Sequence, residues 1–79
     1  MIKLEHIEKK NEVITCEAFV ENCRQPIRLT YDIVSQTLEH DPLPDDYAYC
    51  QMHLAHAKRV LRDMAKSGRI EDRRTIMWY

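Results

Sequence analysis

Apolar and polar side chains alternate along the first half of the chain. Residues 26–34 and 12–21 alternate clearly, and residues 2–7 do so over a shorter stretch. Because a period of two puts one set of side chains on each face of a strand, the pattern predicts three strands that each bury one face. The side chains predicted to face the core are Ile2 and Leu4, then Ile14, Cys16, Ala18 and Val20, and finally Ile27, Leu29, Tyr31 and Ile33.

The breaks between these strands are short and polar. Asn11 lies in the first break and tolerates a left-handed backbone better than its neighbours. The second break, residues 21–25, ends before Pro26, which suits the start of a strand because it has no N–H to donate. Since short connections join antiparallel neighbours, residues 2–34 are predicted to form a three-stranded antiparallel meander.

The period changes from two to 3.6 after residues 40–46, in which two prolines stop a continuing strand. Residues Tyr47–Lys66 are predicted to form one long amphipathic helix, since their apolar residues fall on one arc at about 100° per residue. That arc comprises Tyr47, Cys50, Leu54, Ala57, Leu61, Met64 and Ala65, with His53 and Val60 at its edge. Asp45 or Asp46 is predicted to cap the helix, and Gly68 to end it.

The C-terminal residues 73–79 are rich in strand-forming side chains and predict a fourth strand. Apolar side chains occupy both of its faces, Ile76 and Trp78 on one and Met77 and Tyr79 on the other. Both faces therefore need cover, from the helix or from a second subunit. The expected fold is a single α+β domain over residues 1–79, in the order βββαβ, with the helix packed on the sheet.

Length and cysteine usage add an expectation about assembly and compartment. With 79 residues the chain builds a small core, so a disulfide, a metal or a partner subunit is often needed for stability. The three cysteines form no CxxC pair, and the charged N-terminal segment matches neither a signal peptide nor a membrane span. We therefore expect free thiols, a cytoplasmic location, no membrane association, and self-association, most simply as a homodimer.

Charge is distributed unevenly although the formal net charge is only −1. Residues 1–46 carry five basic and ten acidic side chains, whereas residues 47–79 carry seven basic and three acidic ones. Much of the positive charge follows the polar side of the predicted helix and continues toward the tail. A basic stripe of this kind is typical of a solvated helix face, and it also suits a phosphate backbone or an acidic protein partner. A sequence pI of about 6.4 and the lack of interleaved exposed aromatic residues weaken the nucleic-acid interpretation.

Cys50, His53 and His56 are the residues with the most suggestive chemistry. Their spacing on a helix turns the first and last away from each other by about 120°, so they do not converge on one metal ion. Cys50 and Cys16 are alternatives for a nucleophile, but both are predicted to point into the core. A single glycine excludes a glycine-rich phosphate loop. We expect no metal, no cofactor and no catalytic residue.

The sequence leaves two main functional hypotheses open. The first is a small, non-enzymatic protein-interaction or regulatory domain that associates with itself. The alternative is a nucleic-acid-binding accessory domain that binds weakly through the basic side of the helix, and an enzyme comes third. The candidate interaction surface comprises Lys58, Arg59, Arg62, Lys66, Arg73, Arg74, Trp78 and Tyr79.

Overall fold

The computed structural model describes residues 1–78. Tyr79, which was predicted to belong to the C-terminal strand and to the interaction surface, lies outside the described residues. Its elements follow the chain in the order β1 (Ile2–Lys10), β2 (Val13–Val20), β3 (Ile27–Asp32), β4 (Thr37–His40), a 3₁₀ turn (Asp45–Tyr47), α1 (Gln51–Ser67) and β5 (Arg74–Ile76). The strands form one antiparallel sheet in the order β4-β3-β2-β1-β5. The α+β fold expected from the sequence is thereby confirmed, with one strand more than predicted.

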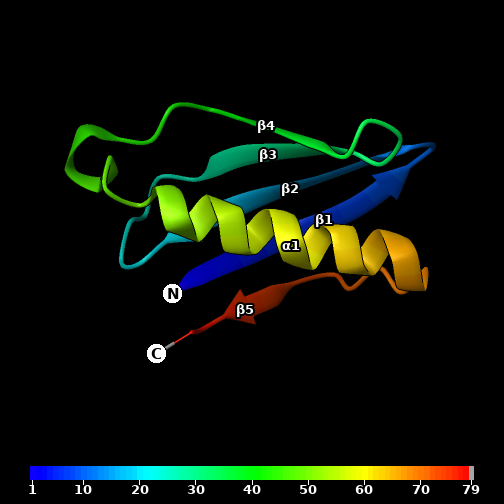
Figure 1. The fold of residues 1–79 in the computed structure, drawn as a ribbon. Coiled ribbons are helices and arrows are strands. Elements are labelled where there is room, and N and C mark those ends of the chain that lie inside the picture. Colours follow the sequence, from blue (N-terminus) through cyan, green and yellow to red (C-terminus); the bar gives the residue numbers. More distant parts are fainter. Residues whose placement is uncertain (79) are drawn as a thin grey trace.

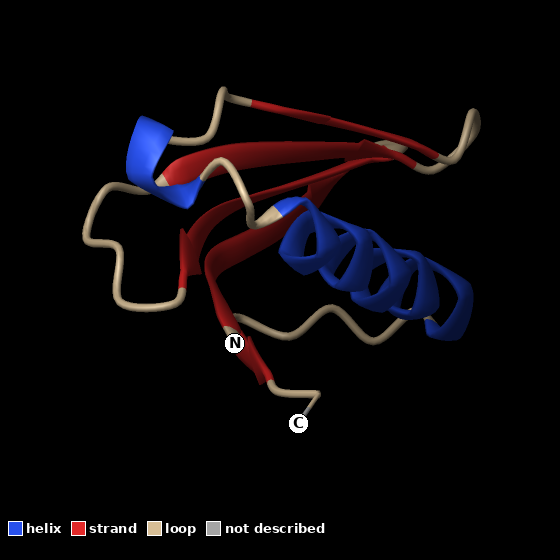
Figure 2. Ribbon diagram, turned by 60° about the vertical axis from the view of Figure 1, so that its left-hand side comes forward, coloured by secondary structure: helices blue, strands red, loops and turns tan. Residues whose placement is uncertain are grey.

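One face of the sheet is covered by α1, which lies across it as a second layer (Figures 1 and 2). The alternating apolar residues of the strands meet the apolar arc of the helix there, as their periods predict. The other sheet face carries no helix in the described part of the chain. The buried apolar residues are Ile2, Leu4, Ile7, Ile14, Cys16, Ala18, Val20, Cys23, Ile27, Leu29, Tyr31, Cys50, Leu54, Ala57, Leu61 and Met64.

A β-bulge interrupts β1 and changes which of its side chains reach the core. The register with β2 shifts between Glu5 and Glu8, and His6 adopts a φ of 52°. This extra residue lets Leu4 and Ile7 face the helix side together, although an odd number of positions separates them. A left-handed backbone costs a residue other than glycine about 1 kcal/mol, which burial of Ile7 offsets.

The fourth strand in chain order, β4, was not predicted. It pairs with β3 from Asp32↔Thr37 to Leu29↔His40, after a turn in which Gln36 has a φ of 58°. The Asp32 carboxylate accepts hydrogen bonds from the backbone N–H groups of the next turn residues, at 2.9 and 3.0 Å. Only Leu38 is partly buried in β4, so the strand has almost no apolar alternation to reveal it.

The helix begins at Gln51 rather than at Tyr47 as predicted, and it ends where the sequence indicates. The residues after Pro44 form a separate 3₁₀ turn, which contains the two aspartates expected to cap the helix. Gly68 has a φ of 75°, and its N–H donates to the Met64 carbonyl at 2.9 Å. This left-handed C-terminal residue is the predicted helix stop.

The C-terminal strand exists, but it spans only Arg74–Ile76 and pairs with residues 2–4 of β1 at the sheet edge. Ile76 lies opposite Ile2 and therefore faces the helix side of the sheet. Met77 follows it and is 63% exposed, so the second apolar face predicted for the tail is open to solvent there.

Candidate interaction surface

The outer side of α1 carries the basic residues that the sequence singled out. Lys58, Arg59 and Lys66 are exposed, and Arg62 is partly exposed; these four residues are called the basic face below. None of the first three has an ion pair within residues 1–78. Arg62 Nε lies 4.0 Å from Asp63 Oδ1 and makes no hydrogen bond in the same range. The basic face is therefore a surface of weakly compensated positive charge.

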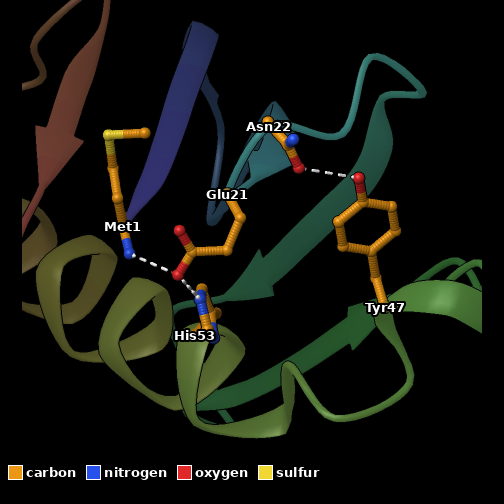
Figure 3. Close-up of polar contacts among 5 residues, drawn as sticks. All are labelled: Met1, Glu21, Asn22, Tyr47 and His53. Carbon is orange, nitrogen blue, oxygen red and sulfur yellow. Dashed lines mark hydrogen bonds and ion pairs between the residues drawn. The ribbon is translucent and has the colours of Figure 1, made fainter.

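Two exposed side chains with apolar surface lie near the start of the helix, Met52 in its first turn and Tyr49 just before it. Tyr49 is 69% exposed and Met52 64% exposed. The Tyr49 ring stacks on Tyr47 with centroids 6.4 Å apart, and the Tyr47 hydroxyl donates to Asn22 Oδ1 at 2.8 Å (Figure 3). Because Tyr47 is held in this way, it supports a fixed position for the exposed Tyr49 ring. The exposure of Tyr49 was not predicted from the sequence.

Arg73 and Arg74, predicted to continue the basic stripe, do not lie on the basic face. Arg74 donates to Glu71 Oε2 at 2.8 Å and lines a cleft of about 470 Å³ between the end of α1 and the segment before β5. Arg73 borders a different hollow, beside Glu5 and His6. The structure thus separates the two tail arginines from the four basic residues of the helix, and Arg74 is already neutralised by a local partner.

Trp78 packs against the helix through two histidines. The His53 ring meets it edge-on at a centroid distance of 4.7 Å, and the His56 ring stacks on it at 4.2 Å with an interplanar angle of 22°. Trp78 is half-buried as a result. It anchors the C-terminal tail to α1, which is a structural use of a residue that the sequence assigned to an interaction surface.

His53 also belongs to a polar cluster at the sheet end nearest the start of α1 (Figure 3). Glu21 Oε1 accepts a hydrogen bond from the Met1 amine at 3.0 Å and lies 2.7 Å from His53 Nε2. The hydrogen bond with His53, followed by the one from the N-terminal amine, lowers the pKa of Glu21 below its usual range. Since a carboxylate is favoured at this position, the cluster ties β1, β2 and α1 together electrostatically.

Cys16 and Cys50 are in surroundings that suppress the reactivity of their thiols. Burial raises the pKa of Cys16 to about 12, and it also raises the pKa of Cys50, whose side chain is completely buried. Both sulfurs are therefore thiols near neutral pH, whereas nucleophilic attack needs a thiolate. Within residues 1–78 no group of three His, Cys, Asp or Glu side chains is arranged to hold a metal ion.

A histidine–carboxylate pair on the open sheet face escaped the sequence analysis. His6 Nδ1 lies 2.6 Å from Glu17 Oε1, and the ring is well exposed at the bulge. The only sequence signal is that Ile7 is out of phase with Ile2 and Leu4, which indicates a bulge without saying what His6 contacts.

Comparison with known proteins identifies no relative. No family model matches the chain, and neither a curated protein nor a solved structure is similar to it. In residues 1–78, no helix is both long enough and apolar enough to cross a membrane. The fold and the surface of α1 are therefore the basis for a functional proposal.

Proposed function

We propose that this protein is a small, non-enzymatic protein-interaction domain that binds partners through the basic face of α1. The observation that carries this proposal is the weakly compensated positive charge of four neighbouring helix residues on the outer layer of a protein whose formal net charge is −1. Such a local excess favours a partner that presents acidic side chains. The raised pKa values of Cys16 and Cys50 support the non-enzymatic part of the proposal.

Nucleic acid is the second candidate partner, and Tyr49 is the observation that favours it. The exposed Tyr49 ring just before α1 offers a base-stacking site, although the nearest residue of the basic face, Lys58, comes more than two helical turns later. Against this stand the sequence pI of about 6.4 and the length of the basic face, which offers few phosphate contacts. Binding of this kind would be weak and would decrease steeply with salt.

Self-association is part of the proposal, and the edge of β4 supports it better than α1 does. Two copies of α1 in contact would bring the basic face against itself. In the described residues the outer edge of β4 has no neighbouring strand (Figure 1). Light scattering over a range of concentrations tests this part separately, because a constant monomer mass would remove self-association and leave the α1 surface unaffected.

The test of the α1 surface compares two double variants with the wild type. Arg59→Ala with Arg62→Ala removes charge from the basic face, and Lys3→Ala with Lys10→Ala removes the same charge from exposed positions on β1. The probes are polyglutamate and oligothymidylate of equal length, measured by fluorescence anisotropy at low and physiological salt.

We expect the α1 variant to lose polyglutamate binding and the β1 variant to keep it. Binding of oligothymidylate without polyglutamate would transfer the function to nucleic acid. Equal losses in both variants, or no binding of either probe, would contradict a protein-binding surface on α1.

A further inference from the structure

An outward-facing ridge of α1 has the three- and four-residue spacing of a helix-packing seam. Met52, Ala55, Arg59, Arg62 and Lys66 follow one another at intervals of three and four residues, and together they span about 21 Å of helix. Four of these side chains are exposed, whereas Arg62 is partly exposed and, with Lys66, borders a hollow beside Tyr31 on β3. In Figure 2 no other segment of residues 1–78 lies on the side of α1 that faces away from the sheet. The ridge could therefore receive a second helix without any rearrangement of the fold.

The two halves of this ridge differ in chemistry. The half nearer the start of α1 combines exposed Met52 with Ala55, whose small side chain allows close approach of another backbone. The half nearer the end carries Arg59, Arg62 and Lys66, with the exposed Asp63 beside Arg62 as the acidic residue of the same turns. A matching partner needs an apolar contact at one end and carboxylates at the other.

The same arrangement argues against a second copy of this chain as the occupant. An antiparallel pair of α1 helices centred on this ridge would place Arg59 of one copy near Arg59 of the other. A parallel pair would align Arg62 and Lys66 with their own copies. Like charges in contact are destabilising in both arrangements. Complementary charge therefore has to come from a different protein segment.

We propose that the ridge binds an acidic amphipathic helix of another protein, packed antiparallel to α1. In that orientation the partner's N-terminal half carries acidic side chains against Arg59, Arg62 and Lys66, and its C-terminal half carries apolar side chains against Met52 and Ala55. Acidic residues stabilise the N-terminal turns of the partner helix, and the two helix dipoles run in opposite directions. This inference rests on the proposed function and specifies the partner's chemistry and orientation.

Three synthetic peptides of about 20 residues, long enough to cover the ridge, test the proposal. The first places glutamates and then leucines at three- and four-residue spacing on one face. The second has the same composition with the leucines first, and the third has lysine in place of glutamate. Binding is followed by calorimetry, and circular dichroism reports whether the peptide becomes helical on binding.

We expect the first peptide to bind with a gain of helix. The second should bind at least about threefold more weakly, because it matches the ridge only when packed parallel, which puts its glutamates at its own helix C-terminus. The double variant Arg59→Glu with Arg62→Glu should bind the first peptide about tenfold or more weakly, since two attractions between opposite charges become repulsions. Met52→Ser should lower the affinity for the first peptide about threefold, because apolar contact is lost. The matched control, Lys3→Glu with Lys10→Glu on β1, should leave the affinity unchanged.

The outcomes separate this inference from the proposed function. Equal binding of the first two peptides, or binding without gain of helix, would overturn the antiparallel helix and leave a less specific acidic partner. Binding that is insensitive to charge reversal on α1 but lost in the β1 variant would overturn both. Tighter binding of oligothymidylate than of the first peptide at the same salt would assign the ridge to nucleic acid instead.

Discussion

Replacement of Trp78 by alanine should be among the most destabilising single changes outside the fully buried core. Trp78 joins the C-terminal tail to α1 through its ring contacts with His53 and His56. Aromatic pairs of this kind contribute about 0.5–1.5 kcal/mol each beyond simple burial. The half-buried indole adds about 1–2 kcal/mol of apolar transfer free energy.

Together these contributions predict a loss of about 3 kcal/mol in the free energy of unfolding. A domain of 79 residues has about 4–12 kcal/mol in total, so the change removes a large fraction of its stability. The unfolding entropy of a chain this long is about 0.17 kcal/mol/K, which converts the loss into a decrease in Tm of about 15–20 °C. A truncation after Met77 should have the same effect.

Thermal melting followed by circular dichroism measures the loss, and fluorescence reports its origin. Trp78 is the single tryptophan of the chain, so emission of the wild type comes from the docked tail. It should shift to the red on unfolding, and acrylamide should quench it less in the native state than in the unfolded state. Met77→Ala is the matched control, because that neighbouring side chain is 63% exposed and should change Tm little.

A double-mutant cycle identifies the ring contact itself. His53→Ala and Trp78→Ala together should cost about 1 kcal/mol less than the sum of the two single changes. An unchanged Tm for Trp78→Ala, together with tryptophan emission from the native wild type equal to that from the unfolded wild type, would refute the reasoning and show a tail that does not pack on α1.

Three further predictions concern other parts of the fold. Gly68→Ala should lower the free energy of unfolding by about 1 kcal/mol, or Tm by about 6 °C. The cause is the φ of 75° and not a clash, because no atom lies within 4 Å of the added methyl group. An unchanged Tm would contradict the left-handed backbone at the helix end. The lowered pKa of Glu21 means that its carboxylate stabilises the fold above its ordinary pKa of about 4.3, and that this stability is lost as pH falls through the lower folded-state pKa. Glu21→Gln should therefore have a Tm that depends less on pH in acid than the wild type, and parallel curves would exclude the cluster as the cause. Cys16, with a pKa of about 12, should resist iodoacetamide at neutral pH until the protein is unfolded, and rapid labelling of the native state would show that the thiol is accessible.

Much of the fold follows from local periodicity. The alternating residues of β2 and β3 and the 3.6-residue pattern of α1 each place one apolar face without knowledge of any partner, because backbone geometry fixes which side chains share a face. Gly68 marks the end of the helix for an equally local reason, since it tolerates the left-handed backbone found there. The positions of Lys58, Arg59, Arg62 and Lys66 on the outer side of α1 follow from the same period.

Other features depend on contacts between segments that are distant in the sequence. The short strand β4 has little apolar pattern of its own and is held by pairing with β3. The bulge at His6 is selected because it lets Leu4 and Ile7 both reach the helix side. Neither feature is encoded by a local preference strong enough to read from neighbouring residues.

The candidate interaction surface divides in the same way. Helical periodicity alone gathers the four residues of the basic face, whereas Arg73 and Arg74 leave it because β5 pairs with β1 at the sheet edge, away from the outer side of α1. Trp78 packs on His53 and His56 because that pairing places the tail beside the helix. Sequence therefore determined which residues share a face within each element, and tertiary structure decided which elements lie together, since strand pairing and packing free energies depend on residues far apart in the chain.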